Sequence, residues 1–314
     1  MYTIGIDVGG TNLVAGVVDA EGRLLAKAKT PTPPDDGDPQ PIVDACVNMA
    51  WEACDAAGVE ESDILGIGFG LPGSVDKSTG DVIYCCNIPF VNVPLRRLVQ
   101  AQWDIPVFVE NDANAAALGE AVAGSAKGCK DVLFITLGTG VGGGIIIDGK
   151  VYSGFNDVGG ELGHTVIVHD GVLCGCGRKG CWESYASATA LIRYTRDAMA
   201  AHPDSVMWQL AKSLDRVNGK TAFDAMRAGD DAARDVVSHY IEMLACGLCS
   251  MVNILQPEVV CVGGGIANEG DILLKPLAEI VHRDNYNKTD RKTSIRKAVL
   301  GNDAGVIGAA LCAR

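Results

Sequence analysis

Three glycine-rich stretches decide the fold: Tyr2 to Asn12 (YTIGIDVGGTN), Val132 to Gly144 (VLFITLGTGVGGG) and Val259 to Ala267 (VVCVGGGIA). In each stretch an apolar run that is typical of a strand enters a cluster of glycines. After the first two clusters the chain resumes with extended patterns, at Leu13 to Asp19 and Ile145 to Asp148, so we expect a β-hairpin at both places. Strand, turn and strand in this order exclude the strand–turn–helix of the Rossmann motif.

The segments between these stretches alternate between helical and extended patterns. Apolar residues recur at helical spacing from Pro41 to Ala57 and stop at Gly58, which predicts an amphipathic helix. We predict strands at Ile64 to Phe69 and Ile105 to Val109, and a helix at Ala113 to Ala123. Further helices are predicted at Ala188 to Ala201, Thr221 to Ala228, Asp231 to Asn253, Leu273 to His282 and Gly305 to Ala313.

The repeated hairpin predicts an α/β protein with two similar lobes around a cleft. The 314 residues exceed the usual size of one domain, and a hydrophobic fraction of 48% can build a sizeable core. We place the lobe boundary near Gly119, so that residues 1–118 and 303–314 form the N-terminal lobe and residues 119–302 the C-terminal lobe. The proline-rich residues 31–41 are expected to form a surface loop.

Charge and hydropathy exclude several classes of partner. With 39 acidic and 26 basic residues the net charge is −13, the wrong sign for holding nucleic acid or anionic lipid through a general basic field. No uninterrupted apolar run reaches the length of about 18 residues that spans a membrane. The chain starts without a basic leader or a cleavage pattern, so we expect a cytoplasmic protein with no nucleic-acid or membrane partner.

The glycine clusters suit phosphate groups. Backbone N–H groups approach phosphate oxygens only where side chains are absent, and a threonine hydroxyl adds a donor. Asp7-Val8-Gly9-Gly10-Thr11 and Gly138-Thr139-Gly140 both fit, with Gly263-Gly264-Gly265 as a third loop. A single such turn would be an ordinary hairpin turn, whereas two copies and a third loop favour phosphate binding. Asp7 would then hold Mg²⁺ through oxygen or water.

The dipeptide Asn111-Asp112 lies where a predicted strand meets a predicted helix. One interpretation is a helix N-cap, since Asn and Asp are preferred there. The other is catalysis, because a carboxylate at this place could accept the proton of a hydroxyl that attacks a γ-phosphoryl group. The dipeptide alone leaves both interpretations open.

The most specific motif is Glu161-Leu162-Gly163-His164 followed by Cys174-Gly175-Cys176 and Cys181-Trp182-Glu183. Its three cysteines and one histidine are the ligands of a closed tetrahedral zinc site. Reduced, unliganded cysteines are the alternative, and an iron–sulfur cluster would ordinarily want four thiolates. His169 is the rival imidazole, which we expect at the surface.

The two glutamates that bracket the cysteines, Glu161 and Glu183, are either solvated surface carboxylates or ligand-binding groups. A zinc-bound His164 has its second ring nitrogen free to hydrogen-bond a ligand, so the metal would orient a sugar-binding side chain. Zinc would have a structural role here.

Taken together these motifs resemble the ROK family (repressors, uncharacterised reading frames and kinases), most closely its bacterial glucokinases. The match covers essentially the whole chain, and the segments fall in the family's order. They are Asp7 to Thr11, Leu71 to Gly73, Glu110 to Asn114, Leu137 to Gly144, Glu161 to His164, Cys174 to Glu183 and Gly263 to Gly265. After Asn87 the chain reads Ile88-Pro89-Phe90, where many members have a Gly-Trp pair.

The resemblance implies a two-lobed fold of the actin-like ATPase and sugar-kinase type with Asp112 as the catalytic base. It implies sugar contacts from Gly73, Asn87, Asn111, Asp112, Glu161, His164 and Glu183. It implies a zinc site made of His164, Cys174, Cys176 and Cys181. ATP contacts would come from Asp7, Gly9, Gly10, Thr11, Gly138, Thr139, Gly140, Gly263, Gly264 and Gly265.

The implied activity is ATP-dependent phosphorylation of a hexose at the 6-hydroxyl, with glucose as the expected hexose. The implied cofactors are Mg²⁺ and a structural zinc ion. A kinase for N-acetylmannosamine or another hexose, and a sugar-binding sensor without catalysis, are the alternatives. Asp112 is present, which disfavours the sensor. The donor could also be polyphosphate, and the resemblance suggests a homodimer.

Overall fold

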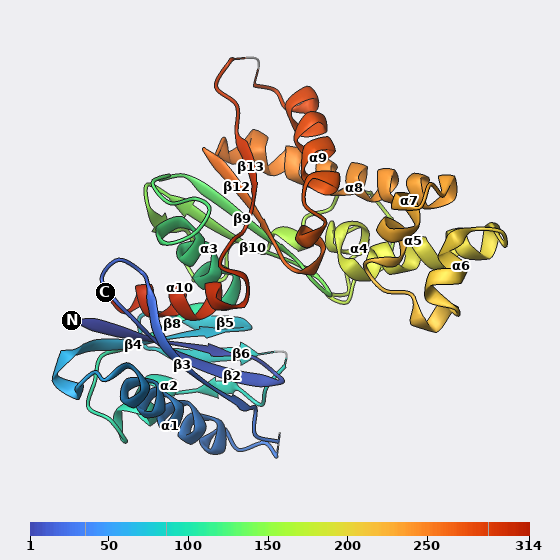
Figure 1. The fold of residues 1–314 in the computed structure, drawn as a ribbon. Coiled ribbons are helices and arrows are strands. Elements are labelled where there is room, and N and C mark those ends of the chain that lie inside the picture. The colour runs from blue at the N-terminus through green and yellow to red at the C-terminus, as the bar shows by residue number, and fades with distance from the viewer. Residues whose placement is uncertain (35, 86, 288) are drawn as a thin grey trace. The chain divides into compact units, whose positions relative to one another are not determined.

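Two five-stranded sheets with the same strand order form the frame of the protein (Figure 1). The first has the order β3-β2-β1-β4-β8 and the second β11-β10-β9-β12-β13. The strands of the first are β1 (Tyr2–Val8), β2 (Asn12–Val18), β3 (Leu24–Pro31), β4 (Ile64–Leu71) and β8 (Val107–Asn111). Those of the second are β9 (Val132–Leu137), β10 (Val141–Ile147), β11 (Lys150–Val151), β12 (Val259–Gly263) and β13 (Ser294–Lys297). The predicted α/β fold with a duplicated hairpin core is confirmed.

The computed structural model describes residues 1–34, 36–85, 87–287 and 289–314. These residues form two compact units, each described by itself below. Unit 1 comprises Met1–Phe134, Gly144–Gly160 and Val299–Arg314. Unit 2 comprises Ile135–Gly143 and Glu161–Ala298. The lobe boundary near Gly119 stays a prediction.

The first sheet is covered on both faces in unit 1. Its strand β1 alternates large and small residues, and Ile4 and Ile6 belong to the core shared with α1 (Gln40–Ala57). Gly5 lies opposite Gly68 in the parallel pairing of β1 with β4. These two glycines lie on the face of the sheet that α10 (Ala304–Cys312) covers, where a Cβ on either would lie 1.8 Å from a carbonyl oxygen of that helix. Glycine therefore lets α10 lie directly on the strand backbones, with α1 on the opposite face (Figure 1).

Helix α3 (Asp112–Val122) packs against α10 in unit 1 and begins where β8 ends. The predicted helix at Ala113 to Ala123 is thus confirmed, and each of its ends lies one residue earlier than predicted. The sequence did not reveal a three-stranded antiparallel sheet, β5 (Gly73–Asp76), β6 (Asp81–Cys85) and β7 (Val91–Val93), nor α2 (Leu95–Gln100). These strands are too short for a clear alternation of apolar and polar residues.

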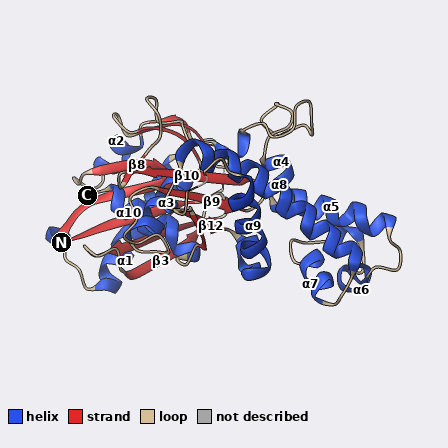
Figure 2. Ribbon diagram, turned by 90° about the horizontal axis from the view of Figure 1, so that it is seen from above, coloured by secondary structure: helices blue, strands red, loops and turns tan. Residues whose placement is uncertain are grey.

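Unit 2 carries a helical group beyond its sheet (Figure 2). Its helices are α4 (Glu183–Ala186), α5 (Ala188–Ala201), α6 (Val206–Ala211), α7 (Thr221–Arg227), α8 (Asp231–Leu255) and α9 (Asp271–Asp284). By length and composition, α8 is the single described helix that could span a membrane. It packs against α5, α7 and α9, which is the position of a core helix.

Short 3₁₀ turns occur in both units. They lie at Glu61–Asp63, Leu162–His164, Leu214–Arg216, Gly265–Glu269 and Gly301–Asp303.

Candidate functional site

Two acidic side chains leave the first sheet at the same edge. In the parallel registers Asp7 lies opposite Gly70 of β4, and Gly70 lies opposite Glu110 of β8. Asp112 follows two residues after Glu110, as the first residue of α3. Because carboxyl ends of parallel strands share one edge, Asp7 and Asp112 come together there. Burial, and secondly the negative charge of Asp112, raise the pKa of Asp7 to about 6.

The N-terminus of α3 is capped by Asn111. Its side-chain oxygen accepts hydrogen bonds from the N–H groups of Ala113 at 2.9 Å and Asn114 at 3.2 Å. Its amide nitrogen donates to the Gly73 carbonyl oxygen at 3.3 Å. The N-cap interpretation therefore holds for Asn111, while Asp112 lies in the first turn of the helix. The Asp112 carboxylate also accepts a hydrogen bond from the Ala113 N–H, at 2.8 Å, so both side chains contact the first turn of the helix.

Two glycines bring neighbouring segments of this edge into contact. Gly73 has a φ of 149°, and a Cβ there would lie 2.0 Å from the Tyr84 carbonyl oxygen. A Cβ on Gly10 would lie 2.9 Å from the carbonyl oxygen of Asn87. The predicted phosphate turn and the predicted sugar loop therefore touch through backbone atoms. In the same turn Thr11 is exposed, and Gly9 donates its N–H to the Asn12 carbonyl oxygen at 3.0 Å.

Unit 2 holds the other two glycine loops next to each other. The turn between β9 and β10 is closed by a hydrogen bond from the Gly138 N–H to the Gly140 carbonyl oxygen, 3.1 Å long. The Thr139 carbonyl oxygen accepts from the Thr189 hydroxyl at 2.8 Å. A Cβ on Gly264 would lie 2.4 Å from the carbonyl oxygen of Leu137, the last residue of β9. Gly263 thus ends β12, and Gly264 and Gly265 follow it beside this turn.

The four predicted metal ligands converge in unit 2. One ligand atom from each of His164, Cys174, Cys176 and Cys181 lies within 4.8 Å of the other three. The Cys174 sulfur lies 3.6 Å from the His164 Nδ1, and the sulfurs of Cys176 and Cys181 are 3.7 Å apart. The predicted rival His169 points to solvent, with 94% of its side chain exposed.

These separations fit a tetrahedral zinc ion. With bonds of about 2.3 Å to sulfur and about 2.0 to 2.1 Å to nitrogen, zinc holds two sulfurs about 3.8 Å apart and a sulfur and a nitrogen about 3.6 Å apart. Both observed distances match those values. Burial raises the pKa of the Cys181 thiol to about 12, so the protein alone does not stabilise a thiolate there. A bound cation would supply the missing charge.

Glu183 connects the cysteine cluster to the glycine turn. One carboxylate oxygen accepts from the Cys174 thiol at 3.4 Å, and the other accepts from the Val141 N–H at 3.1 Å. A Cβ on Gly140 would lie 2.0 Å from this second oxygen, so only glycine leaves room for Glu183. Glu161 is exposed at the start of the 3₁₀ turn that ends at His164.

The structure therefore groups the predicted residues by unit. Unit 1 carries Asp7, Gly9, Gly10, Thr11, Gly73, Asn87, Asn111 and Asp112. Unit 2 carries Gly138, Thr139, Gly140, Glu161, His164, Cys174, Cys176, Cys181, Glu183, Gly263, Gly264 and Gly265. Sequence reasoning missed Lys77 and Glu110, whose side chains form an ion pair of 2.5 Å. The sequence feature that could have indicated this pair is Glu110, an acidic residue at the end of a buried strand. A buried carboxylate needs a partner of opposite charge or a hydrogen-bond donor.

Comparisons with known proteins identify the family of the chain. The family described as "ROK family" matches residues 3–314. The chain is 41% identical to a glucokinase of Streptomyces coelicolor, covering 99% of this chain and 97% of that protein. It is 38% identical to a glucokinase of Halalkalibacterium halodurans, covering 98% and 93%. Among solved structures it is similar to a ROK family glucokinase from Streptomyces griseus in complex with glucose and AMPPNP. That similarity has a TM-score of 0.81 and 40% identity, over 99% of this chain and 98% of that one.

Proposed function

The chain belongs to the ROK family, and on that premise we propose that it is an ATP-dependent glucokinase that phosphorylates the 6-hydroxyl of glucose. The observation that carries this proposal is the position of Asp112. It starts a helix at the carboxyl edge of the first sheet, close enough to Asp7 for its charge to raise the pKa of that residue. A base on a rigid helix start and a second carboxylate beside it are the parts that phosphoryl transfer needs.

In the proposed reaction Asp112 accepts the proton of the attacking sugar hydroxyl. Phosphoryl transfer has a loose transition state, so positioning of the hydroxyl contributes more than strong basicity. We propose that Gly73, Asn87 and Asn111 bind the sugar, and that Glu161, His164 and Glu183 contact the same substrate. Asn111 is already fixed by its capping hydrogen bonds, which lowers the entropy cost of its use as a ligand.

The glycine turns are proposed to bind the nucleotide. Backbone N–H groups of Gly9, Gly10 and Thr11 and of the Gly138-to-Gly140 turn would contact phosphate oxygens, and the loop at Gly263 to Gly265 would face the adenosine. Asp7 would hold Mg²⁺, which neutralises charge that develops on the phosphates.

The metal of unit 2 is proposed to be structural zinc held by His164, Cys174, Cys176 and Cys181. The ring of His164 faces the cluster through Nδ1, so Nε2 is the atom that would reach a sugar. Glu183 is fixed at the same time by the Val141 N–H. Zinc would thus help to orient two side chains that bind the sugar, His164 and Glu183. We further propose a cytoplasmic homodimer, which light scattering of the purified protein tests.

The direct test is an ADP-release assay with ATP, Mg²⁺ and a panel of hexoses. We expect glucose to have the highest kcat/KM, mannose a lower one and N-acetylated hexosamines the lowest. Carboxylates and an imidazole that a bound sugar covers, and that are left without a matching hydroxyl, discriminate by up to about 10⁴-fold. A higher kcat/KM for N-acetylmannosamine would reassign the substrate, and sugar binding without ADP release would indicate a sensor. Glucose 6-phosphate formed with polyphosphate but not with ATP would reassign the donor.

A further inference from the structure

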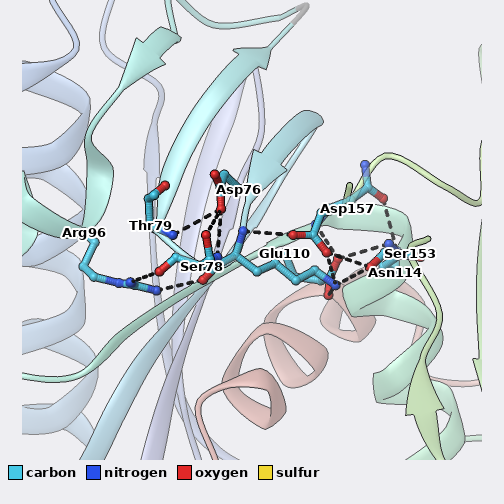
Figure 3. Close-up of polar contacts among 10 residues, drawn as sticks. Asp76, Ser78, Thr79, Arg96, Glu110, Asn114, Ser153 and Asp157 are labelled. Carbon is cyan, nitrogen blue, oxygen red and sulfur yellow. Dashed lines mark hydrogen bonds and ion pairs between the residues drawn. The ribbon is translucent and has the colours of Figure 1, made fainter. Parts of the chain in front are cut away.

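An ion pair without an assigned role lies next to the proposed base. Lys77, in the turn between β5 and β6, has its Nζ 2.5 Å from the Oε2 of Glu110 (Figure 3). The Glu110 residue is only 3% exposed, although it carries a carboxylate. Burial of such a group is costly unless it is paired and hydrogen-bonded. The partners of Glu110 therefore show what the pair does.

The other oxygen of Glu110 holds the start of α3. It accepts hydrogen bonds from the Asn111 N–H and from the Asn114 side-chain nitrogen, both 3.0 Å long. Asn111 is the cap of α3, and Asn114 belongs to its first turn. One carboxylate thus binds the helix on both sides of Asp112 with one oxygen, and Lys77 with the other. Any shift of Glu110 moves the helix start that carries Asp112.

Lys77 is itself held in place by its turn. Asp76 accepts hydrogen bonds from the N–H groups of Ser78 at 2.9 Å and Thr79 at 3.2 Å. The guanidinium of Arg96 donates to the carbonyl oxygens of Lys77 and Ser78, at 3.0 and 2.8 Å. Figure 3 shows these contacts on one side of the turn and Glu110 on the other. These hydrogen bonds fix the turn, and the turn places the ammonium group of Lys77 next to Glu110.

A second segment of unit 1 meets Lys77 on the same side of the turn as Glu110 (Figure 3). Its Nζ donates to the Ser153 hydroxyl at 2.8 Å, and its N–H donates to the Asp157 carboxylate at 3.2 Å. Ser153 in turn donates to Asp157 at 3.1 Å. This segment of unit 1 ends at Gly160, immediately before Glu161 in the sequence. Lys77 thus fixes both the start of α3 and the chain that leads to a proposed sugar ligand.

We propose that Lys77 and Glu110 form a positioning pair for Asn111 and Asp112, an inference that rests on the proposed kinase function. A buried ion pair contributes little net stability compared with well-packed apolar residues. The pair acts through geometry, since Glu110 joins one donor on the β5–β6 turn to two donors at the start of α3. Small misplacement of a reacting group can lower a rate by about 100-fold.

The test compares Lys77→Met, Lys77→Arg, Glu110→Gln and the double variant Lys77→Met/Glu110→Gln. Lys275→Met, which removes an exposed ion pair with Asp271 on α9, is the matched control. Steady-state kinetics are measured per folded molecule, with thermal unfolding in parallel. We expect Lys77→Met to lower kcat by about 10- to 100-fold and to raise the KM for glucose, with the KM for ATP changed by less than about threefold.

The conservative and double variants separate positioning from stability. Lys77→Arg keeps the charge and should retain most of kcat. The double variant removes the unpaired buried charge, so its kcat should exceed that of Lys77→Met. Lys275→Met should stay within about twofold of wild type. If Lys77→Met does not fold, Glu110→Gln and the double variant give the same comparison.

The outcomes distinguish this proposal from the proposed function. Wild-type protein without sugar-dependent ADP release contradicts the function itself. Active wild type together with a Lys77→Met variant of lower melting temperature but unchanged kcat per folded molecule contradicts positioning. Equal losses for ATP and glucose would also contradict it, because the pair contacts the start of α3 and not the glycine turns.

Discussion

The charge of Asp112 raises the pKa of Asp7, which is already raised by burial, to about 6. Asp7 lies near the end of β1 and Asp112 directly after the end of β8, and β4 alone lies between these two strands in the first sheet. Two acidic groups this close repel each other when both are ionised. A divalent cation bound by Asp7 would relieve that repulsion, which is the electrostatic reason for placing Mg²⁺ at this edge.

The first prediction concerns the pH dependence of activity. Asp7 must be ionised to hold Mg²⁺, and its pKa of about 6 lies well above the ordinary 3.8. As pH falls below about 6, kcat/KM for Mg-ATP should therefore decline, approaching about tenfold per pH unit. Initial rates between pH 5 and 8, at saturating glucose, give the profile. A flat profile down to pH 5 would show that Asp7 does not titrate in this way.

The second prediction concerns stability without Mg²⁺. Because the folded-state pKa of Asp7 is raised, the folded protein binds the proton more tightly than the unfolded chain. Its contribution to the free energy of unfolding is full below about pH 4 and is lost as pH rises to about 6. Asp7→Asn removes this dependence, so the variant should gain about 3 kcal/mol relative to wild type across that window. Urea denaturation at several pH values measures it, and parallel pH curves for the two proteins would refute it.

The third prediction is one zinc ion per chain. The cluster distances match tetrahedral coordination, so Cys176→Ser should lose the metal and raise the KM for glucose. Metal analysis of purified protein gives the stoichiometry, and Cys246→Ser, an exposed cysteine on α8, is the control. If the purified protein contains no zinc and a chelator does not change its affinity for glucose, the predicted zinc site is contradicted.

The fourth prediction concerns the packing of Glu183 against the glycine turn. A Cβ on Gly140 would lie 2.0 Å from the Glu183 carboxylate, so Gly140→Ala must displace that side chain. The KM for glucose should rise by about tenfold or more, since a ligand-orienting hydrogen bond is worth about 1.5 to 3 kcal/mol. Lys275→Met, which removes an exposed ion pair on α9, is the control. An unchanged KM in Gly140→Ala would show that Glu183 does not need this position.

The sequence was most informative where a local pattern carries its own physical cause. The helix α1 was predicted because Gly58 can adopt the left-handed conformation that ends it, with a φ of 64°. The paired hairpins were predicted because glycine clusters interrupt two similar apolar runs. The spacing of three cysteines and one histidine correctly predicted a cluster, because their ligand atoms converge.

The remainder depended on contacts between distant segments. The pairing of Lys77 with Glu110 joins a short turn to a buried strand, and the sequence does not indicate which cation lies beside Glu110. The sheet of β5, β6 and β7 that carries this turn has strands of only three to five residues. The dipeptide Asn111-Asp112 likewise needed the structure, because only the hydrogen bonds show that Asn111 caps α3.

The single-turnover rate of glucose 6-phosphate formation in Asp112→Asn tests most directly whether Asp112 is the catalytic base. The amide keeps the shape of the side chain but cannot act as the base. With glucose and Mg-ATP prebound, we expect a rate lower than that of wild type by about 10²- to 10⁴-fold, and a glucose Kd within a few-fold of wild type. A single-turnover rate close to that of wild type would contradict the assignment of Asp112 as the catalytic base.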